Sequence, residues 1–341
     1  MKKTLLALLL VLGLAFSAVA GSDAGTVLLN AAGATFPNPI YSKWFDVYHT
    51  QHPAVQINYQ SIGSGGGIRQ LLAGTVDFGA SDRPMTDDQL SQAKFKILHF
   101  PTVLGAVVAT YNIPGVTGEL NFTQHAIAGI YLGTITKWND PEIVKANPGV
   151  SLPGDDIVVV HRSDGSGTSF IWTDFLTKVS DQWKSQVGAD ASVKWPVGLG
   201  GKGNEGVAGL IKQTPDSIGY VELIYALQNN MSYGLMQNAA GKYVKASLAS
   251  VTAAAAGAAK AMPDDFRVSI TDAPGATAYP ISSFTWLLVP AQISDASKRD
   301  AIKAFLKWML EQGQAYNEGL AYAQLPKPVV AKEMKAISLI Q

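Results

Sequence analysis

The segment His161–Phe170, HRSDGSGTSF, places charged, hydroxyl and glycine residues directly before an apolar run, IWTDFL. The first amides of a helix lack partners within the helix, and the helix dipole places about half a positive charge at that end. Arg162 can offer a planar fork to two oxygens of an anion. Ser166 and Thr168 can donate from their hydroxyls, and Gly167 lets the backbone approach a ligand closely. The segment therefore predicts a site for a small, multiply charged oxyanion.

Three further segments place hydroxyls or a carboxylate where an expected strand meets a loop or a helix. They are Gly33–Pro37 (GATFP), Ser61–Gly67 (SIGSGGG) and Phe78–Asp82 (FGASD). Each of them alone is typical of an ordinary turn or helix cap, but four such segments in one chain favour a shared site. We expect Ser64 to stand at a helix N-cap, with its hydroxyl and the following amides facing an anion.

Other ligand-binding and catalytic motifs do not fit these residues. GSGGGI lacks the last glycine of a dinucleotide fingerprint, and GLGGKGN lacks the end of a P-loop. Neither Ser64 nor Ser166 lies in a G-x-S-x-G turn. The five histidines show no metal-ligand spacing, and the chain has no cysteine. We therefore expect no catalytic residues, no cofactor and no metal.

The N-terminal sequence predicts export. MKK is followed by an apolar run that ends in Ala18-Val19-Ala20, which is typical of a signal peptide at residues 1–20 cut after Ala20. The run is too short for a membrane anchor, since a spanning helix needs about 20 apolar residues. Without a cysteine there is no site for an N-terminal lipid. A freely diffusing exported protein fits a bacterial periplasm best.

The length and charge of the mature chain limit the number of domains and the class of partner that it can have. Removal of Lys2 and Lys3 with residues 1–20 leaves slightly more acidic than basic side chains, which argues against nucleic acid as a partner. The remaining chain, about 320 residues long, exceeds the length at which one hydrophobic core usually stops growing. We therefore expect two domains.

Apolar runs of strand length alternate with helical runs, which predicts an α/β fold with ligands at the carboxyl ends of strands. The expected strands are 26–30, 55–60, 78–80, 103–111, 157–162, 218–221 and 284–289, and the expected helices are 38–49, 68–73, 122–132, 141–145, 169–179, 205–212, 222–229, 246–261 and 298–312.

No linker divides the chain, so the domain boundary is expected inside ordered segments. The long apolar runs 100–111 and 280–289 are the natural crossings. Crossing at both makes the first lobe discontinuous. The expected division is 25–103 plus 279–341 for lobe I and 104–278 for lobe II.

Seven motifs, in order along the chain, resemble the periplasmic phosphate-binding proteins of the high-affinity phosphate ABC transporter. They are AAGATFPNPIYSKW, SIGSGGGIRQ, VDFGASDRPM, GIYLGTITKWND, HRSDGSGTSF, VKWPVGLGGKGN and SIGYVE. The resemblance implies a two-lobed periplasmic binding protein fold, with crossing hinge strands and a ligand cleft between the lobes. It also implies a non-enzymatic, monomeric periplasmic receptor that binds inorganic phosphate and delivers it to the membrane permease subunits of an ABC importer.

Carried over motif by motif, the resemblance also implies a set of ligand contacts. Phosphate would contact Thr35, Phe36, Ser64, Asp82, Arg162, Ser166, Gly167 and Thr168, and Asp164 would pair with Arg162 and hold its guanidinium in place. The family often has a second serine after Ser64, where this chain has Gly65. An ionised Asp82 can only accept hydrogen bonds, so it suits phosphate, which carries a proton, and opposes sulfate, which carries none.

Two other functions stay open at this point. A receptor for another tetrahedral oxyanion, such as sulfate or molybdate, would have no use for the proton acceptor Asp82. A phosphatase or serine hydrolase would need a base or a metal beside Ser64 or Ser166, and the sequence offers neither in place. The segment GTITKWNDPE is our hypothesis for a functional surface loop, in which Trp138 serves either function or anchoring.

Overall fold

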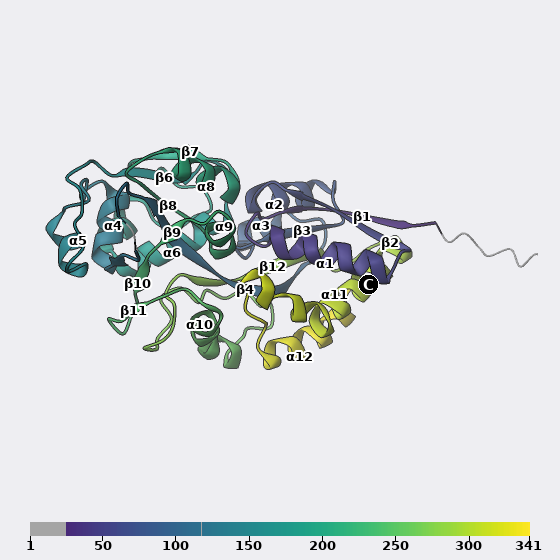
Figure 1. The fold of residues 1–341 in the computed structure, drawn as a ribbon. Coiled ribbons are helices and arrows are strands. Elements are labelled where there is room, and N and C mark those ends of the chain that lie inside the picture. The colour runs from purple at the N-terminus through teal and green to yellow at the C-terminus, as the bar shows by residue number, and fades with distance from the viewer. Residues whose placement is uncertain (1–24, 117) are drawn as a thin grey trace, which may run out of the picture.

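The structure is a computed structural model that describes residues 25–116 and 118–341, so the expected signal peptide at residues 1–20 lies outside the described part of the chain. Its main sheet has the strand order β2-β1-β3-β12-β4-β8-β6-β7, with β9 paired to β4. Helices flank this sheet (Figure 1), as the alternating sequence pattern predicts. The α/β fold class is therefore confirmed.

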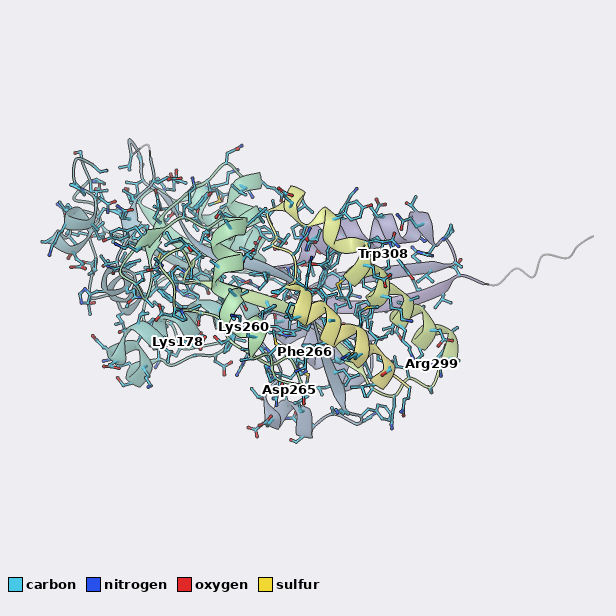
Figure 2. The ribbon with its side chains drawn as sticks, turned by 90° about the horizontal axis from the view of Figure 1, so that it is seen from below. Lys178, Lys260, Asp265, Phe266, Arg299 and Trp308 are labelled. Atoms are coloured by element: carbon cyan, nitrogen blue, oxygen red, sulfur yellow. The ribbon has the colours of Figure 1, made fainter. Side chains whose placement is uncertain are left out.

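One group of elements packs around the N-terminal strands. β1 (Val27–Gly33) pairs in parallel with β2 (Val55–Ser61) and with β3 (Phe78–Ser81). The helices of this group are α1 (Asn38–Gln51), α2 (Ser64–Ala73), α3 (Asp87–Ser91), α11 (Ala296–Glu311) and α12 (Lys327–Ala336). Trp308 of α11, labelled in Figure 2, donates from Nε1 to Gln51 Oε1 at the end of α1 over 2.7 Å. The C-terminal helices thereby close over the N-terminal strands.

A second group of elements packs around β6 (Val158–Arg162). This strand pairs in parallel with β7 (Leu199–Gly201) on one side and with β8 (Ser217–Glu222) on the other. The remaining elements of this group are α4 (Gln124–Leu132), α5 (Pro141–Ala146), α6 (Gly167–Val179), α7 (Asp181–Gln186), α8 (Gly203–Gln213), α9 (Leu223–Gln228), β9 (Ser232–Tyr233), and a small sheet of β5 (Asn121–Phe122), β10 (Leu235–Gln237) and β11 (Tyr243–Val244). Helix α10 (Leu248–Lys260) packs against α12 and against the two long strands β4 and β12.

Two long strands join the two groups (Figure 1). β4 (Ile97–Asn112) pairs with β12 (Ser282–Pro290) over its first part, up to Ala106, and with β8 from Val107 onward. Both strands are almost entirely buried, which explains why each reads as a continuous apolar run. The apolar runs expected at 100–111 and 280–289 thus lie in these two strands. The division of the chain into two lobes at the expected residues stays a prediction.

Most expected elements are present with shifted ends, and the expectation that Ser64 is an N-cap is wrong. α2 begins at Ser64 instead of at residue 68, and its N-cap is Gly63, with a φ of 84° and no side-chain cap. The glycines after Ser64 carry no apolar pattern, so apolar periodicity alone predicts a helix that begins at Ile68. The expected helix 122–132 begins at Gln124, because Phe122 belongs to β5.

Two further local features bear on the expectations. The alanine-rich stretch forms α10, with its apolar side packed inward. Trp138 is fully buried and donates from Nε1 to Asp216 O over 3.0 Å, so it anchors its loop to the core. In the described part of the chain, no helix has the length and apolarity needed to cross a membrane.

Candidate functional site

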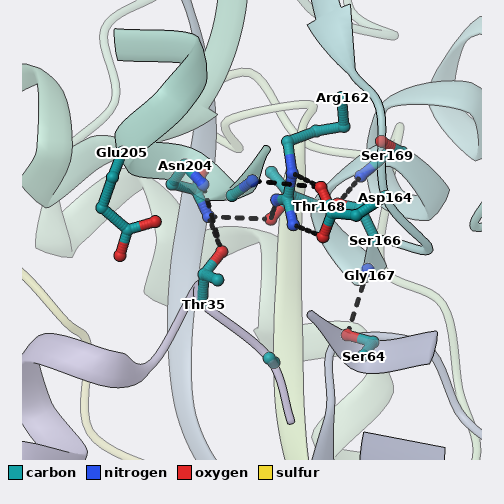
Figure 3. Close-up of polar contacts among 12 residues, drawn as sticks. Thr35, Ser64, Arg162, Asp164, Ser166, Gly167, Thr168, Ser169, Asn204 and Glu205 are labelled. Carbon is teal, nitrogen blue, oxygen red and sulfur yellow. Dashed lines mark hydrogen bonds and ion pairs between the residues drawn. The ribbon is translucent and has the colours of Figure 1, made fainter. Parts of the chain in front are cut away.

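Four helix N-termini meet where the two groups of elements face each other. Gly167, the first residue of α6, donates its amide to Ser64 Oγ at the start of α2 over 3.0 Å. Asn204, near the start of α8, donates from Nδ2 to Thr35 Oγ1 just before α1 over 2.7 Å and to Thr168 Oγ1 over 3.2 Å (Figure 3). The positive ends of four helices therefore surround one small region, which suits an anion.

The residues expected to contact a ligand are buried in or around this region, and Asp164 lies at its edge. The structure brings together Thr35, Ser64, Asp82, Arg162, Gly167 and Thr168. The side chains of Phe36 and Ser166 have other partners. Phe36 packs its ring against Tyr322, and Ser166 Oγ accepts from the amide of Ser169 as the N-cap of α6. A ligand contact of Phe36 would be made through its backbone amide. The amide of Ser166 donates to Ala191 O over 2.9 Å, so a contact of Ser166 would be made through its hydroxyl proton. Both contacts stay predictions.

Asp82 follows β3 and lies close to the first residue of α6. Thr285 of β12 donates from its hydroxyl to Asp82 Oδ1 over 2.7 Å. Asp82 Oδ2 is buried and has no hydrogen-bond partner among the described residues. A Cβ placed on Gly167 would lie 2.6 Å from this oxygen, so only glycine allows α6 to approach so closely. The carboxylate thus keeps one acceptor oxygen free at the N-terminus of α6.

Burial raises the pKa of Asp82 from 3.8 to about 7, against the lowering effects of the Thr285 hydrogen bond and the Arg162 charge. The carboxyl therefore exchanges its proton near neutral pH. A neighbouring group that donates a hydrogen bond to Oδ2 would favour the ionised form.

Arg162 and Asp164 form a bidentate ion pair beside the site. Arg162 Nε lies 2.8 Å from Asp164 Oδ1, and Arg162 Nη2 lies 2.6 Å from Oδ2. Burial opposes the charge of Asp164, but the bonds from Arg162 and from the Gly203 amide outweigh it and lower the pKa of this carboxyl. The remaining guanidinium nitrogen, Nη1, points toward Thr168 Oγ1 at 3.4 Å. The pair therefore fixes the arginine and offsets most of its charge.

Glycines let the two loops that carry these residues touch. The amide of Gly65 donates to Gly165 O over 2.9 Å, and a Cβ on either glycine would come within 3.2 Å of the other residue's Cα. A Cβ on Gly63 would lie 2.3 Å from Asp164 Oδ2. The departure from the family at Gly65 therefore falls at a close backbone contact between the two groups.

Sequence reasoning missed two residues that complete the site. Asn204 lies in the GLGGKGN segment, which lacks the end of a P-loop, although a glycine-rich turn before a helix is the signal that the other segments share. Thr285 lies inside the apolar run of β12, and no local signal marks it.

The arrangement is suited to binding and lacks the elements of nucleophilic catalysis. Ser64 Oγ accepts from the amides of Asp82 and Gly167, and no histidine or lysine in the described part of the chain bonds to Ser64 or to Ser166. His161 stacks on Trp195 with ring centroids 4.8 Å apart, and its Nδ1 contacts Arg162 O. Within residues 25–116 and 118–341, no three acidic, histidine or cysteine side chains gather as metal ligands would.

Comparisons with known proteins agree with this geometry. A family model described as "PBP superfamily domain" matches residues 18–312. The phosphate-binding protein PstS of Xylella fastidiosa is 47% identical, over 91% of this chain and 85% of that protein. The PstS proteins of Pasteurella multocida and Haemophilus influenzae are 45% and 43% identical, over 89% of this chain in both cases and 88% and 90% of those proteins.

Solved structures share the fold at lower identity. A high-affinity periplasmic phosphate-binding protein solved with phosphate has a TM-score of 0.71 at 20% identity, covering 91% of this chain and 93% of that one. A phosphate-binding protein from Stenotrophomonas maltophilia gives 0.71 at 18% identity, with the same coverage. The chain therefore belongs to the PBP superfamily and, within it, to the family of PstS phosphate-binding proteins.

Proposed function

We propose that this protein binds inorganic phosphate between its two groups of elements and delivers it to the permease subunits of an ABC importer. The observation that carries the proposal is the free, buried oxygen of Asp82 at the start of α6. A site made of helix N-termini and hydroxyls attracts an anion, and one acceptor among these donors selects an anion that still carries a proton. Phosphate has this combination near neutral pH.

The hydrogen-bond donors that remain available in the site support the same ligand. Ser64 Oγ already accepts from two amides, so its hydroxyl proton is available to donate. Arg162 and the amide of Thr168, which has no partner within its helix, add donors on the opposite side. Hydrogen bonds to a charged ligand contribute roughly 1.5–3 kcal/mol each. Tight binding therefore follows from many oriented dipoles, with little net positive charge.

Discrimination against sulfate follows from the ionisation of Asp82. Above its pKa of about 7 the carboxylate presents lone pairs only, which a P–OH group satisfies and sulfate cannot. Below that pH, a protonated Asp82 can donate to sulfate. We therefore expect the preference for phosphate over sulfate to increase as the pH rises through about 7.

Binding between the groups implies closure of the protein on its ligand. Phosphate held by Thr35, Ser64 and Asp82 on one side and by Arg162 and Thr168 on the other stabilises the closed arrangement, in which both sets of contacts exist. In this proposal the two moving lobes are lobe I, residues 25–103 plus 279–341, and lobe II, residues 104–278. The lobes would rotate about the crossing strands β4 and β12.

The place of action in the proposal is the periplasm. Residues 1–20 have the pattern of a signal peptide, and cleavage after Ala20 would leave Gly21 as the first residue. Mass spectrometry of the N-terminus of the exported protein tests this cut. Without a lipid anchor, the receptor would act as a freely diffusing monomer.

Calorimetry at pH 8.5 with phosphate, arsenate, sulfate and a phosphate monoester tests the ligand. We expect the wild-type protein to bind phosphate and arsenate and to release no product from the ester. In Asp82→Asn, the amide can donate where the carboxylate could only accept, so phosphate should bind more weakly and sulfate should gain affinity. Unchanged discrimination in this variant would refute the role of Asp82, and turnover of the ester would revive a phosphatase.

A further inference from the structure

Asn204 is a fully buried amide at the second position of α8 that contacts both sides of the site. Its Nδ2 donates to Thr35 Oγ1 over 2.7 Å and to Thr168 Oγ1 over 3.2 Å. Its Oδ1 accepts from the backbone amide of Glu222 over 2.9 Å. Figure 3 shows Asn204 between the two threonines, one from each group of elements.

The orientation of this amide follows from its partners. The backbone N–H of Glu222 can only donate, so the atom that faces it must be the carbonyl oxygen of Asn204. Both protons of Nδ2 then point to the two threonine hydroxyls. Asn204 can therefore act only as a donor toward Thr35 and Thr168.

The lone pairs of both hydroxyls are consequently engaged. Thr35 Oγ1 also accepts from the backbone amide of Asn204 over 3.2 Å, and Thr168 Oγ1 also faces Arg162 Nη1 at 3.4 Å. A hydroxyl has two acceptor lone pairs and one proton. Each threonine is left with its proton, so each can only donate to a further partner.

We propose that Asn204 is a positioning residue for phosphate, because it turns the hydroxyl protons of Thr35 and Thr168 toward the ligand and links the two halves of the site. The inference rests on the proposed function, since it concerns the direction of donors toward that ligand. A structural latch alone would join the halves equally well with the hydroxyls reversed. The donors of Asn204 instead exclude the arrangement in which the threonines accept from the ligand.

A double-mutant cycle in the full-length mature protein tests this coupling. Phosphate affinity is measured by calorimetry for the wild type, Asn204→Ala, Thr35→Val and the double variant. We expect each single change to weaken binding by between about 10- and 100-fold. Because Asn204 acts through the Thr35 hydroxyl, the two losses of affinity should overlap. The double variant should therefore bind phosphate far more tightly than the product of the two single fold-losses predicts.

Three further variants give the cycle its controls. Thr35→Ser keeps the hydroxyl, so it should restore both the affinity and the coupling to Asn204. Asn58→Ala, at an exposed position of β2, should bind phosphate like the wild type. Asn204→Leu fills the space without polar atoms, and it should bind as weakly as Asn204→Ala. Thermal unfolding without phosphate identifies any variant that does not fold, and the remaining Asn204 variant then completes the cycle.

The outcomes separate the two proposals. A wild-type protein that does not bind phosphate refutes the proposed function. A wild-type protein that binds, together with folded Asn204 variants of unchanged affinity or with effects that multiply in the double variant, refutes the inference alone. Loss of coupling in Thr35→Ser would equally contradict it, since that variant keeps the hydroxyl that Asn204 is said to orient.

Discussion

Two carboxylates lie near the same arginine, and their surroundings give them different tasks. Asp164 receives two bonds from Arg162 and one from a backbone amide, which hold its pKa low and keep it charged. Asp82 is more deeply buried, and the pKa rises to about 7. The first is suited to fixing a cation, and the second to exchanging a proton with a ligand.

Thr285 is expected to tune the proton affinity of Asp82. Its hydroxyl donates to Oδ1 and lowers the pKa of a carboxyl that burial otherwise raises. Thr285→Val keeps the shape and removes this bond, so the pKa should rise further. We expect phosphate to bind about 10-fold more weakly at pH 7, and the preference over sulfate to develop at a higher pH than in the wild type.

Calorimetric titration with phosphate and sulfate between pH 6 and pH 9 measures this shift. Thr285→Ser retains the donor and should follow the wild-type profile. A Thr285→Val profile that overlays that of the wild type would show that Asp82 does not depend on Thr285.

At the scale of elements, an irregularity in β4 and β12 lies beside Thr285. The register shifts between Thr285 and Trp286, which pair with Val103 and Pro101, so Thr102 of β4 is skipped. Thr102 Oγ1 donates to Thr285 O over 3.2 Å and contacts the hydroxyl of Tyr41. Such bulges bend a strand and change the direction of its side chains. Here the bulge lies beside Thr285, whose hydroxyl donates to Asp82.

Helix α12 contains a buried carboxyl group that the proposed function does not use. Glu333 is fully buried, both of its carboxylate oxygens lack partners among the described residues, and burial raises the pKa well above its usual value. A raised pKa makes the native state bind a proton more tightly than the unfolded chain does. Stability is therefore lost as the pH rises above the unfolded value, near 4.5.

Glu333→Met should raise the free energy of unfolding by about 1–3 kcal/mol at pH 8, because it removes an unsatisfied buried group of similar volume. The gain should be smaller at pH 5, where the glutamate is protonated in the native state. Urea unfolding at the two pH values measures both. Glu311→Met, at an exposed position of α11, should change little. A loss of stability in Glu333→Met at pH 8 would contradict this account.

At the scale of the whole molecule, we expect the proposed closure to depend on the contact between the loops of Gly65 and Gly165. A side chain larger than hydrogen at Gly165 would press on the facing backbone. Gly165→Val should therefore hold the lobes apart, reduce phosphate affinity by about 100-fold and leave the folding of each lobe intact. The physical reason is that an open protein contacts the ligand from one side.

Small-angle scattering with and without phosphate measures closure in this variant. The wild type should become more compact with phosphate, while Gly165→Val should not. Gly209→Val, on α8 where a Cβ meets no neighbour within 4 Å, controls for the loss of a glycine. Normal compaction in Gly165→Val would show that the loop contact does not limit closure.

The sequence by itself determined the alternation of elements and the segments that begin the site-forming helices. Both are local properties: apolar periodicity selects strands and helices, and the types of residue before a helix decide whether its N-terminus suits an anion. The seven family motifs could be read for the same reason, since each is a short run. Ser64 was found in this way even though its helix was expected to start four residues later.

Only the tertiary structure decided which distant residues complete the site. Asn204 reaches Thr35 across 169 positions, and Thr285 reaches Asp82 across 203. Strand register, the bulge at Thr102 and the approach of bare glycine backbones bring these pairs together, and none of the three is encoded in local spacing. Burial then raises the pKa of Asp82, because the surrounding core excludes the water that would stabilise its charge. The sequence thus indicated an anion site. The packing of distant segments decided which of its groups donate hydrogen bonds and which accept them.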